Sequence, residues 1–181
     1  MSVILPTLEK QFNLSDADQE ILGSILFLGI FIGSVIAGFL SDRMGRRKLV
    51  LYTSICQFIF GIISAFVSAF SSFVVLRGIL GIMIGGTIPI MITYVTEISP
   101  SSKRGKGQVY IQAFFVFGMI YAMLCASIFL QDLETGNWRA VLVMGSLPAL
   151  VVFAGAVKYL KESPRFLIAT DKIVDGVQVL N

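Results

Sequence analysis

The chain has 181 residues, of which 56% are hydrophobic and 14% are charged. Soluble domains carry about 25% charged residues, so the composition excludes an ordinary soluble fold and favours an integral membrane protein. Histidine, the commonest general base and metal ligand, is absent from the sequence. Cys56 and Cys125 lie inside apolar runs. We expect reduced packing residues there, with no metal site, no cofactor and no disulfide framework.

A net charge of +3 would also suit a protein that binds nucleic acid. The charged residues, however, stand in short clusters between long apolar runs, and membrane orientation explains this arrangement better. The sequence pairs no nucleophile with a base and contains no phosphate-binding loop and no grouping of metal ligands. We therefore expect neither a nucleic-acid partner nor an enzyme.

Five apolar stretches are long enough to supply the ~20 helical residues that cross a bilayer. In chain order they are residues 20–41, 49–70, 73–97, 107–130 and 138–160. Ser15, Asp16 and Asp18 offer N-caps ahead of the first stretch, and Pro164 marks the end of the last. The predicted fold class is an all-α integral membrane protein with about five transmembrane helices.

The basic residues divide the loops into two sides. If the loop 42–48 is placed inside, eleven Lys and Arg residues lie inside and two lie outside, while Arg77 falls within a span. Cytoplasmic loops of membrane proteins are enriched in Lys and Arg. The pattern therefore predicts a multi-pass protein with a cytoplasmic C-terminus and an N-terminus on the opposite side.

The loop between the first two spans reads GFLSDRMGRRK, residues 38–48. Gly38 allows close approach of another helix, and Gly45 permits a tight turn with positive φ. Asp42 can accept hydrogen bonds from amides at a helix N-terminus, and the arginines can pair with carboxylates or lipid phosphate. The loop resembles the signature Gly-x-Leu-(small)-Asp-Arg-x-Gly-Arg-(Arg/Lys) of the major facilitator superfamily. The alternative is an ordinary positively charged loop.

Two further stretches resemble the same superfamily. The family's fourth helix has an early Arg, small residues at intervals of four, and a Glu seven residues before an Arg-Gly. Here these are Arg77, Gly81, Gly85, Glu97, Arg104 and Gly105. Residues 138–167 resemble the sixth helix, although Lys161 stands where the family has Pro. The branch resembled is that of sugar porters and organic-ion carriers, and GGTIP, residues 85–89, leans toward the organic-acid, nicotinate and synaptic-vesicle-related carriers.

The resemblance implies that the five spans correspond to helices two to six in the first half of a two-half carrier. Residues 3–8 look like the tail of a preceding helix. We therefore expect three parts. They are an extracytoplasmic segment with a remnant of helix one, 1–19, the five-span bundle, 20–160, and the start of a central cytoplasmic linker, 161–181.

An ion network is expected at the cytoplasmic end. Arg77 and Glu97 are 20 residues apart, about 30 Å along a helix, so Arg77 lies near the outer side and Glu97 near the inner side. The expected members are Asp42, Arg43, Gly45, Arg46, Arg47, Glu97, Arg104, Glu162 and Arg165. In the family such a network latches the outward-facing state and breaks on switching. The alternative is a static cluster that only holds the helices in register.

Few polar residues are available to line a solute cavity. The resemblance points Arg77 toward the first helix, and the alternative is a side chain that snorkels to the outer interface. Gln112 lies eight residues after Arg104, the offset of a substrate-contacting Gln in sugar porters. The other candidates are Thr93 and Tyr121, followed by Thr87, Tyr94 and Tyr110. For each of these residues the favoured alternative is helix packing through an interhelical hydrogen bond.

The expected function is transport of a small solute, a sugar or an organic ion, by alternating access as part of a full-length secondary carrier. The expected partners are the solute, the lipid bilayer and the second half of the carrier. One alternative is a half-carrier that works as an oligomer, and another is a non-transporting membrane subunit. Because no carboxylate lies in the middle of a span, coupling to protons stays open.

Overall fold

The structure is a computed structural model that describes residues 5–12, 14–130 and 136–169. Within these ranges the chain forms helices and no strands. In chain order the elements are α1 (Leu5–Phe12), α2 (Asp16–Met44), α3 (Arg46–Phe66), α4 (Phe70–Ile98), the 3-10 turn η1 (Ser101–Lys103), α5 (Arg104–Phe129), α6 (Trp138–Tyr159) and α7 (Pro164–Ala169).

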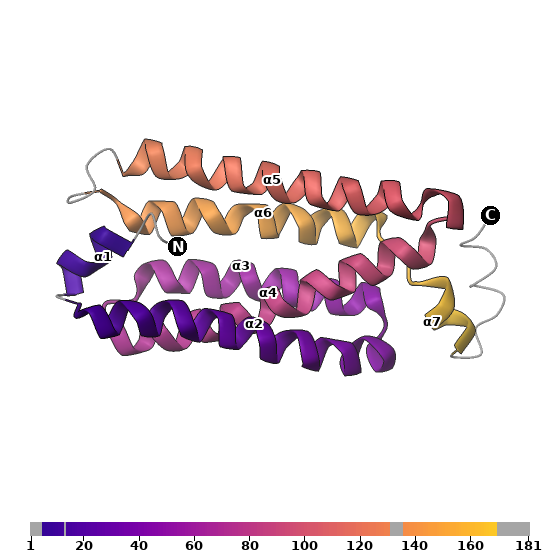
Figure 1. Cartoon of the computed structure of the whole chain (residues 1–181), viewed down its shortest axis with the longest axis horizontal. Helices are drawn as coiled ribbons and strands as arrows, with labels where there is room; N and C mark the ends of the chain where they lie inside the picture. The colour runs from indigo at the N-terminus through magenta and orange to yellow at the C-terminus, as the bar shows by residue number, and fades with distance from the viewer. Residues whose placement is uncertain (1–4, 13, 131–135, 170–181) are drawn as a thin grey trace.

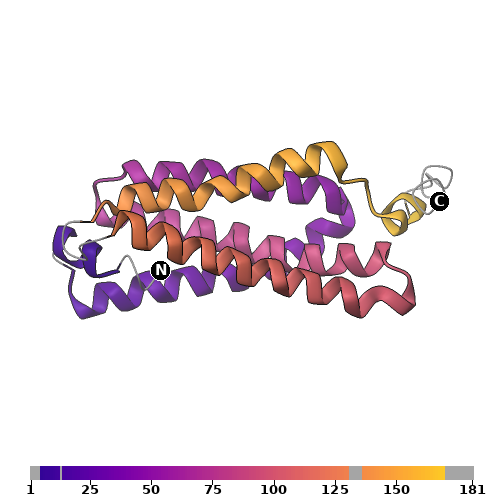
Figure 2. The same cartoon turned by 90° about the horizontal axis from the view of Figure 1, so that it is seen from above.

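Helices α2 to α6 are each long and apolar enough to cross a membrane. They run side by side along the long axis of the molecule, with α5 and α6 on one side and α2, α3 and α4 on the other (Figure 1, and from above in Figure 2). The all-α, five-span prediction is confirmed. The helix ends differ little from those predicted, as the first span illustrates with Asp16–Met44 in place of 20–41.

The start of α2 follows the predicted capping chemistry. The backbone N–H of Asp18 donates to Ser15 Oγ at 3.3 Å, and the backbone N–H of Ser15 donates to Asp18 Oδ2 at 3.0 Å. This reciprocal pair satisfies two amide groups that would otherwise lack helical partners. The prediction for Pro164 is wrong, because α6 already ends at Tyr159 and Pro164 is the first residue of α7. Proline is favoured at that position, where its missing N–H costs no hydrogen bond.

Helices α2 and α4 pack through facing glycines at four-residue spacing. These are Gly29 and Gly33 on α2, and Gly81 and Gly85 on α4. A Cβ atom at Gly33 would collide with the carbonyl of Ile82, and one at Gly85 with the carbonyl of Ile30, both far closer than 3.0 Å. In a bilayer, where no hydrophobic effect drives helices together, such close backbone packing is a main source of helix association.

Buried apolar residues form a core near each end of the bundle. At the end that carries α1, the core contains Leu8, Leu22, Phe73, Ala126, Leu130, Trp138 and Val141. At the other end it contains Ala37, Leu49, Val50, Ile90 and Ala156. We call this second end the basic end. The turn between α2 and α3, η1 and the segment that follows α6 lie there, and their Lys and Arg residues make it positively charged.

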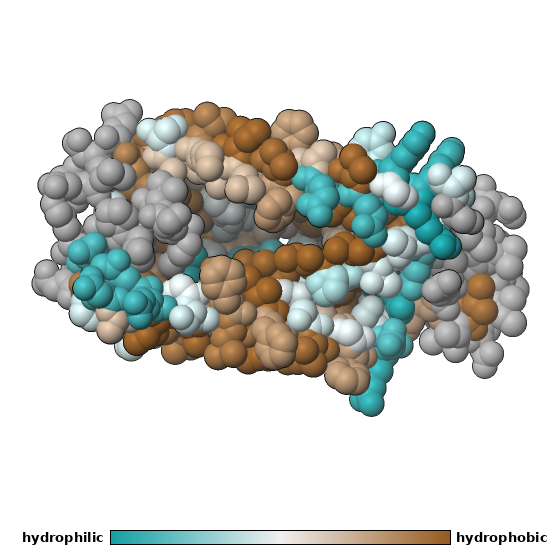
Figure 3. All heavy atoms as spheres, in the orientation of Figure 1, coloured by the Kyte–Doolittle hydropathy of each residue, from teal (hydrophilic) through white to brown (hydrophobic). Residues whose placement is uncertain are grey.

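The surface alternates between polar ends and an apolar middle. Hydrophilic side chains gather toward the two ends of the face drawn in Figure 3, and hydrophobic ones cover most of the length between them. Helix α5 is the least covered of the five spans, and Phe114, Phe117 and Met123 are 74%, 65% and 61% exposed. Apolar surface of this extent is expected to face lipid or another helix.

Candidate functional site

The basic end is organised around a buried ion pair between α3 and α4. Arg46 Nη2 lies 3.1 Å from Glu97 Oε1, and the two side chains are only 12% and 5% exposed. The same Nη2 lies 3.2 Å from Asp42 Oδ1, on a side chain that is 76% exposed. Arg46 Nη1 donates to the carbonyl of Ser41 at 3.1 Å. The guanidinium of Arg46 therefore joins the end of α2 to the end of α4.

The second carboxylate oxygen of Glu97 extends this pair to the chain beyond α6. Ser163 Oγ donates a hydrogen bond to Glu97 Oε2, and Ser163 is fully buried. Ser163 was not among the predicted members. Its place within the Glu-Ser-Pro-Arg stretch was the available signal, because a hydroxyl next to the linker acid can reach whatever that acid approaches. The ends of three helices thus meet at Glu97.

At the same end, a side chain that follows α6 caps the start of α3, and a side chain of α3 caps the end of α6. Glu162, which follows α6, accepts a hydrogen bond from the backbone N–H of Arg47 at 3.1 Å. Arg47, in the first turn of α3, donates from Nη2 to the carbonyl of Val157 at 3.2 Å. Each side chain has the charge that the partner helix end favours, since helix N-termini attract anions and C-termini attract cations. Tyr94 adds a third tie through a 3.1 Å hydrogen bond from its hydroxyl to the carbonyl of Lys161.

Gly45 allows this arrangement by its backbone conformation. Its φ is +88° with ψ at 156°, as the sequence predicted for a turn with positive φ, and this region is essentially restricted to glycine. A Cβ atom there would also lie 2.7 Å from Glu162 Oε2. The close reversal between α2 and α3 is what brings the Arg47 amide to the Glu162 carboxylate.

Replacing Gly45 by alanine is expected to lower the free energy of unfolding by about 2–3 kcal/mol, because backbone strain and the collision with Glu162 add. Thermal unfolding of the purified protein in detergent measures this. Gly38→Ala, near the end of α2, is the control, since a Cβ atom there would meet nothing within 4 Å. Equal melting temperatures for the two variants would contradict the role given to Gly45.

Some predicted members of the network lie outside it. Arg104 is exposed and donates from Nε only to the carbonyl of Ser99, at 3.4 Å. Arg43 is exposed and forms no ion pair within the part of the chain that the structure describes. The side chain of Arg165 lies outside the described residues. The expectation that Arg104 and Arg43 join the network is therefore not met, because both point to the solvent side of their helix ends.

Two expectations for the signature loop are also corrected. Asp42 pairs with Arg46, four residues later, at 3.2 Å, and within the described part of the chain its carboxylate accepts no hydrogen bond from a backbone amide. A Cβ atom at Gly38 would meet nothing within 4 Å, so Gly38 is not a point of close helix packing, and it lines a small hollow between α2 and α4 with Asp42, Arg46 and Thr93. Both groups are thus left open on one face of α2.

Arg77 faces a cavity in the interior of the bundle. The cavity, of about 310 Å³, is lined by α3, α4, α5 and α6, and its polar groups include Gln57, Ser64 and Ser146. Arg77 Nε and Nη2 are buried without a hydrogen-bond partner in the described ranges, and its Cζ lies 4.8 Å from the centre of the Phe73 ring. The side chain therefore does not snorkel to the interface.

The other polar candidates differ in how far their hydrogen-bonding capacity is used. Tyr121 donates from its hydroxyl to the carbonyl of Met144 at 2.9 Å, which ties α5 to α6. Thr93 donates to the carbonyl of Pro89 in its own helix at 2.8 Å. Gln112 and Tyr110 are exposed on α5, and neither side chain has a hydrogen bond to a described residue. Among these four residues, Gln112 and Tyr110 thus keep their full hydrogen-bonding capacity within the described part of the chain.

One polar contact between helices was missed by the sequence reasoning. Gln57 Nε2 donates to Thr87 Oγ1 at 2.8 Å and to the carbonyl of Met83 at 3.1 Å, which joins α3 to α4 beside the Arg77 cavity. Gln57 is a mid-span amide, and in an apolar run such a residue signals an interhelical partner. For metals, the described residues hold no group of three or more His, Cys, Asp or Glu side chains.

Comparison with solved structures identifies the fold as that of a major facilitator carrier. The proton:xylose symporter XylE bound to 6-bromo-6-deoxy-D-glucose aligns with a TM-score of 0.85 and 25% identity, over 98% of this chain and 44% of that one. The partially occluded inward-open xylose transporter XylE from E. coli gives a TM-score of 0.82, over 98% and 50% of the two chains, at 25% identity.

The family model described as sugar (and other) transporter matches residues 4–181, so the chain belongs to that family. Synaptic vesicle glycoprotein 2B of Rattus norvegicus is 34% identical over 190 residues, which cover 99% of this chain and 28% of that protein. Synaptic vesicle glycoprotein 2A of Homo sapiens is 32% identical over 188 residues, covering 98% and 25%. The chain thus spans roughly a quarter of the length of these relatives.

Proposed function

We propose that this chain supplies helices two to six of a secondary carrier that moves a small solute, a sugar or an organic ion, across a membrane by alternating access. The observation that carries this proposal is the buried Arg46–Glu97 pair, which joins α2, α3, α4 and the segment after α6 at one end of the bundle. Membership in a transporter family supports it. The basic end is the cytoplasmic end, in keeping with the excess of Lys and Arg there.

The network acts as a latch between two states of the carrier. A buried ion pair is costly to open one partner at a time, because an uncompensated charge remains in a poorly solvated site. Such a cluster therefore has two discrete arrangements, closed and fully hydrated, rather than a continuous range. Asp42 and the hollow beside it lie on an exposed face of α2. The second half of the carrier docks there and senses whether the latch is closed.

The cavity beside Arg77 binds part of the transported solute. A guanidinium offers a planar fork of donors, which both hydroxyl and carboxylate oxygens accept. An intramembrane Arg without a partner in hydrocarbon is expensive and usually faces a cavity or a functional partner. Gln112, exposed on α5 and without a hydrogen-bond partner among the described residues, is a second solute contact. Tyr121 and Thr93, whose hydroxyls are already bonded to backbone carbonyls, contribute less.

Uptake by the native protein in proteoliposomes tests the proposal. The protein is purified from its own membranes, and radiolabelled sugars, organic cations and organic anions are offered in turn. Saturable uptake of one class, competed by unlabelled solute of that class, is the expected result. Absence of saturable uptake for every class, with the protein folded and inserted, would instead favour a non-transporting half-carrier subunit that acts through oligomerisation.

Replacing Arg77 by leucine is expected to raise the KM for the transported solute at least tenfold, because a hydrogen bond to a charged group is worth about 1.5–3 kcal/mol. Concentration-dependent uptake measures this, alongside the amount of folded protein. Arg139→Leu is the matched control, since Arg139 is exposed at the start of α6. If Arg77→Leu transports as well as Arg139→Leu, Arg77 plays no part in solute binding.

A further inference from the structure

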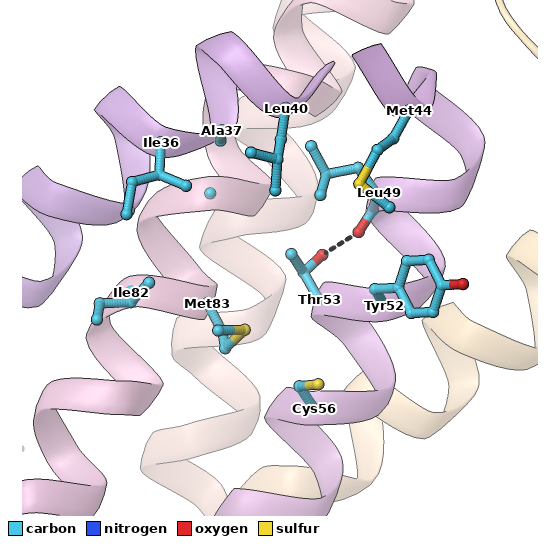
Figure 4. Close-up of a pocket in the computed structure, with 12 residues that line it drawn as sticks. Ile36, Ala37, Leu40, Met44, Leu49, Tyr52, Thr53, Cys56, Ile82 and Met83 are labelled. Carbon is cyan, nitrogen blue, oxygen red and sulfur yellow. Dashed lines mark hydrogen bonds between the residues drawn. The ribbon is translucent and has the colours of Figure 1, made fainter. Parts of the chain in front are cut away.

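An apolar groove opens on the side of the bundle where α2, α3 and α4 meet, toward the basic end (Figure 4). Its cavity of about 330 Å³ is lined by Ile36, Leu40 and Met44 on α2, Leu49 and Cys56 on α3, and Met83 on α4. The hydroxyl of Thr53, also in the lining, already donates to the carbonyl of Leu49 at 2.9 Å. The other polar groups of the lining are the hydroxyl of Tyr52 and the thiol of Cys56, and the remaining side chains are apolar.

The walls of the groove lie partly open at membrane depth. Ile36, Leu40 and Tyr52 are 43%, 36% and 56% exposed, and all three belong to helices long and apolar enough to span a membrane. The groove therefore opens at the depth where the hydrocarbon chains of the bilayer surround the protein.

Two cations stand at the end of the groove nearest the turn between α2 and α3. Arg43 lies three residues after Leu40 on α2, and Lys48 lies four residues before Tyr52 on α3. Residues three or four apart share a helix face, so both cations lie on the helix faces that line the groove. Arg43 and Lys48 are exposed, and neither is paired with a carboxylate in the described part of the chain. Arg46, which lies between them in the sequence, is paired with Glu97. The two outer cations thus remain free beside an apolar slot.

We propose that this groove binds one acyl chain of an anionic phospholipid whose phosphate is held by Arg43 and Lys48. An apolar slot that ends at two unpaired cations matches the two parts of such a lipid, the chain and the charged headgroup. A neutral helix would leave both cations without a counter-charge. Because Met44 and Leu49 flank the turn that positions Arg46, a bound lipid would brace the latch from outside, which rests on the function proposed above.

Lipid titration followed by native mass spectrometry tests this site on the detergent-solubilised protein. The probes are 1-palmitoyl-2-oleoyl-phosphatidylglycerol and the phosphatidylcholine with the same chains. We expect one phosphatidylglycerol molecule to bind tightly, and phosphatidylcholine to bind with an affinity at least tenfold lower. Each basic residue near an anionic lipid raises the binding affinity by about a factor of five. The double variant Arg43→Gln/Lys48→Gln should therefore lower the affinity for phosphatidylglycerol roughly thirtyfold.

Lys103→Gln/Lys106→Gln is the matched control, since it removes the same charge from exposed residues at the same end. It should weaken binding less than threefold. An equal loss in both double variants would mean that the surface attracts anionic lipid only through its overall charge, which overturns the proposal.

Cys56→Phe tests the groove itself without changing any charge. Filling the groove should abolish the tight binding of phosphatidylglycerol. The melting temperature in lipid-free detergent should stay within a few degrees of that of the parent protein. Full-affinity phosphatidylglycerol binding by this variant would show that no chain enters the groove. A Cys56 thiol that resists maleimide both with and without lipid would show that protein covers the slot. Either result overturns the proposal, and neither bears on solute uptake, so the two hypotheses fail separately.

Discussion

Replacing Gly85 by alanine is expected to prevent α2 and α4 from packing and to lower the free energy of unfolding by about 3 kcal/mol or more. The added Cβ atom would collide with the backbone of Ile30. A flexible side chain could move aside, but a helical backbone cannot do so without separating the helices. Thermal unfolding in detergent, with the yield of monodisperse protein, measures the effect.

Gly86→Ala provides a control one residue away in the same helix. Its Cβ atom would lie 3.5 Å from Ala37 Cβ and 3.7 Å from Thr53 Cγ2, both ordinary van der Waals contacts. Alanine favours a helix over glycine by about 1 kcal/mol, so this variant should be as stable as the parent or slightly more so. Equal behaviour of Gly85→Ala and Gly86→Ala would contradict the close packing of α2 on α4.

Replacing Glu97 by glutamine is expected to cost about 3–5 kcal/mol, because among the described residues it leaves the buried Arg46 guanidinium with the exposed Asp42 alone as a counter-charge. Asp42→Asn, by contrast, should cost less than about 1 kcal/mol, as is usual for an exposed pair. The exposed fractions of the two carboxylates, 5% and 76%, are the reason for this difference. Thermal unfolding ranks the variants, and solute uptake reports their effect on switching.

The double variant Arg46→Gln/Glu97→Gln separates the charge from the packing. With both buried charges removed, much of the stability lost in Glu97→Gln should return. If the pair is a latch, uptake stays impaired in the double variant although stability recovers. Recovery of both properties would point to a static cluster that only holds the helices in register. A destabilisation by Asp42→Asn as large as that by Glu97→Gln would contradict the burial argument.

The spans and the turn were predictable because each depends on local chemistry. A bilayer demands about 20 apolar helical residues whatever the neighbours do, and the five helices follow the apolar runs closely. Gly45 could be assigned a positive φ because few other residues tolerate one, and the structure has φ at +88°. The capping of α2 by Ser15 is likewise decided within four residues.

The partners of the charged side chains were less predictable. Sequence spacing placed Glu97, Arg46 and Glu162 at the same end, and they are indeed neighbours in one network with Ser163. It could not exclude Arg43 or Arg104, because the direction of a charged side chain at a helix end depends on how that helix is rotated. The same limitation hid the facing glycines of α2, although GIFIG at 29–33 mirrors GIMIG at 81–85.

The sequence by itself determined that this is a five-span helical membrane protein of a transporter family, with its cations concentrated in the loops of one side. Hydrocarbon thickness, helix geometry and the conformational freedom of glycine are enough for that. Only the tertiary structure decided that Arg77 lines a cavity between four helices and that α2, α3 and α4 together line an apolar groove. Those outcomes depend on the rotation of each helix about its own axis, which is set by backbone contacts such as Gly85 against Ile30.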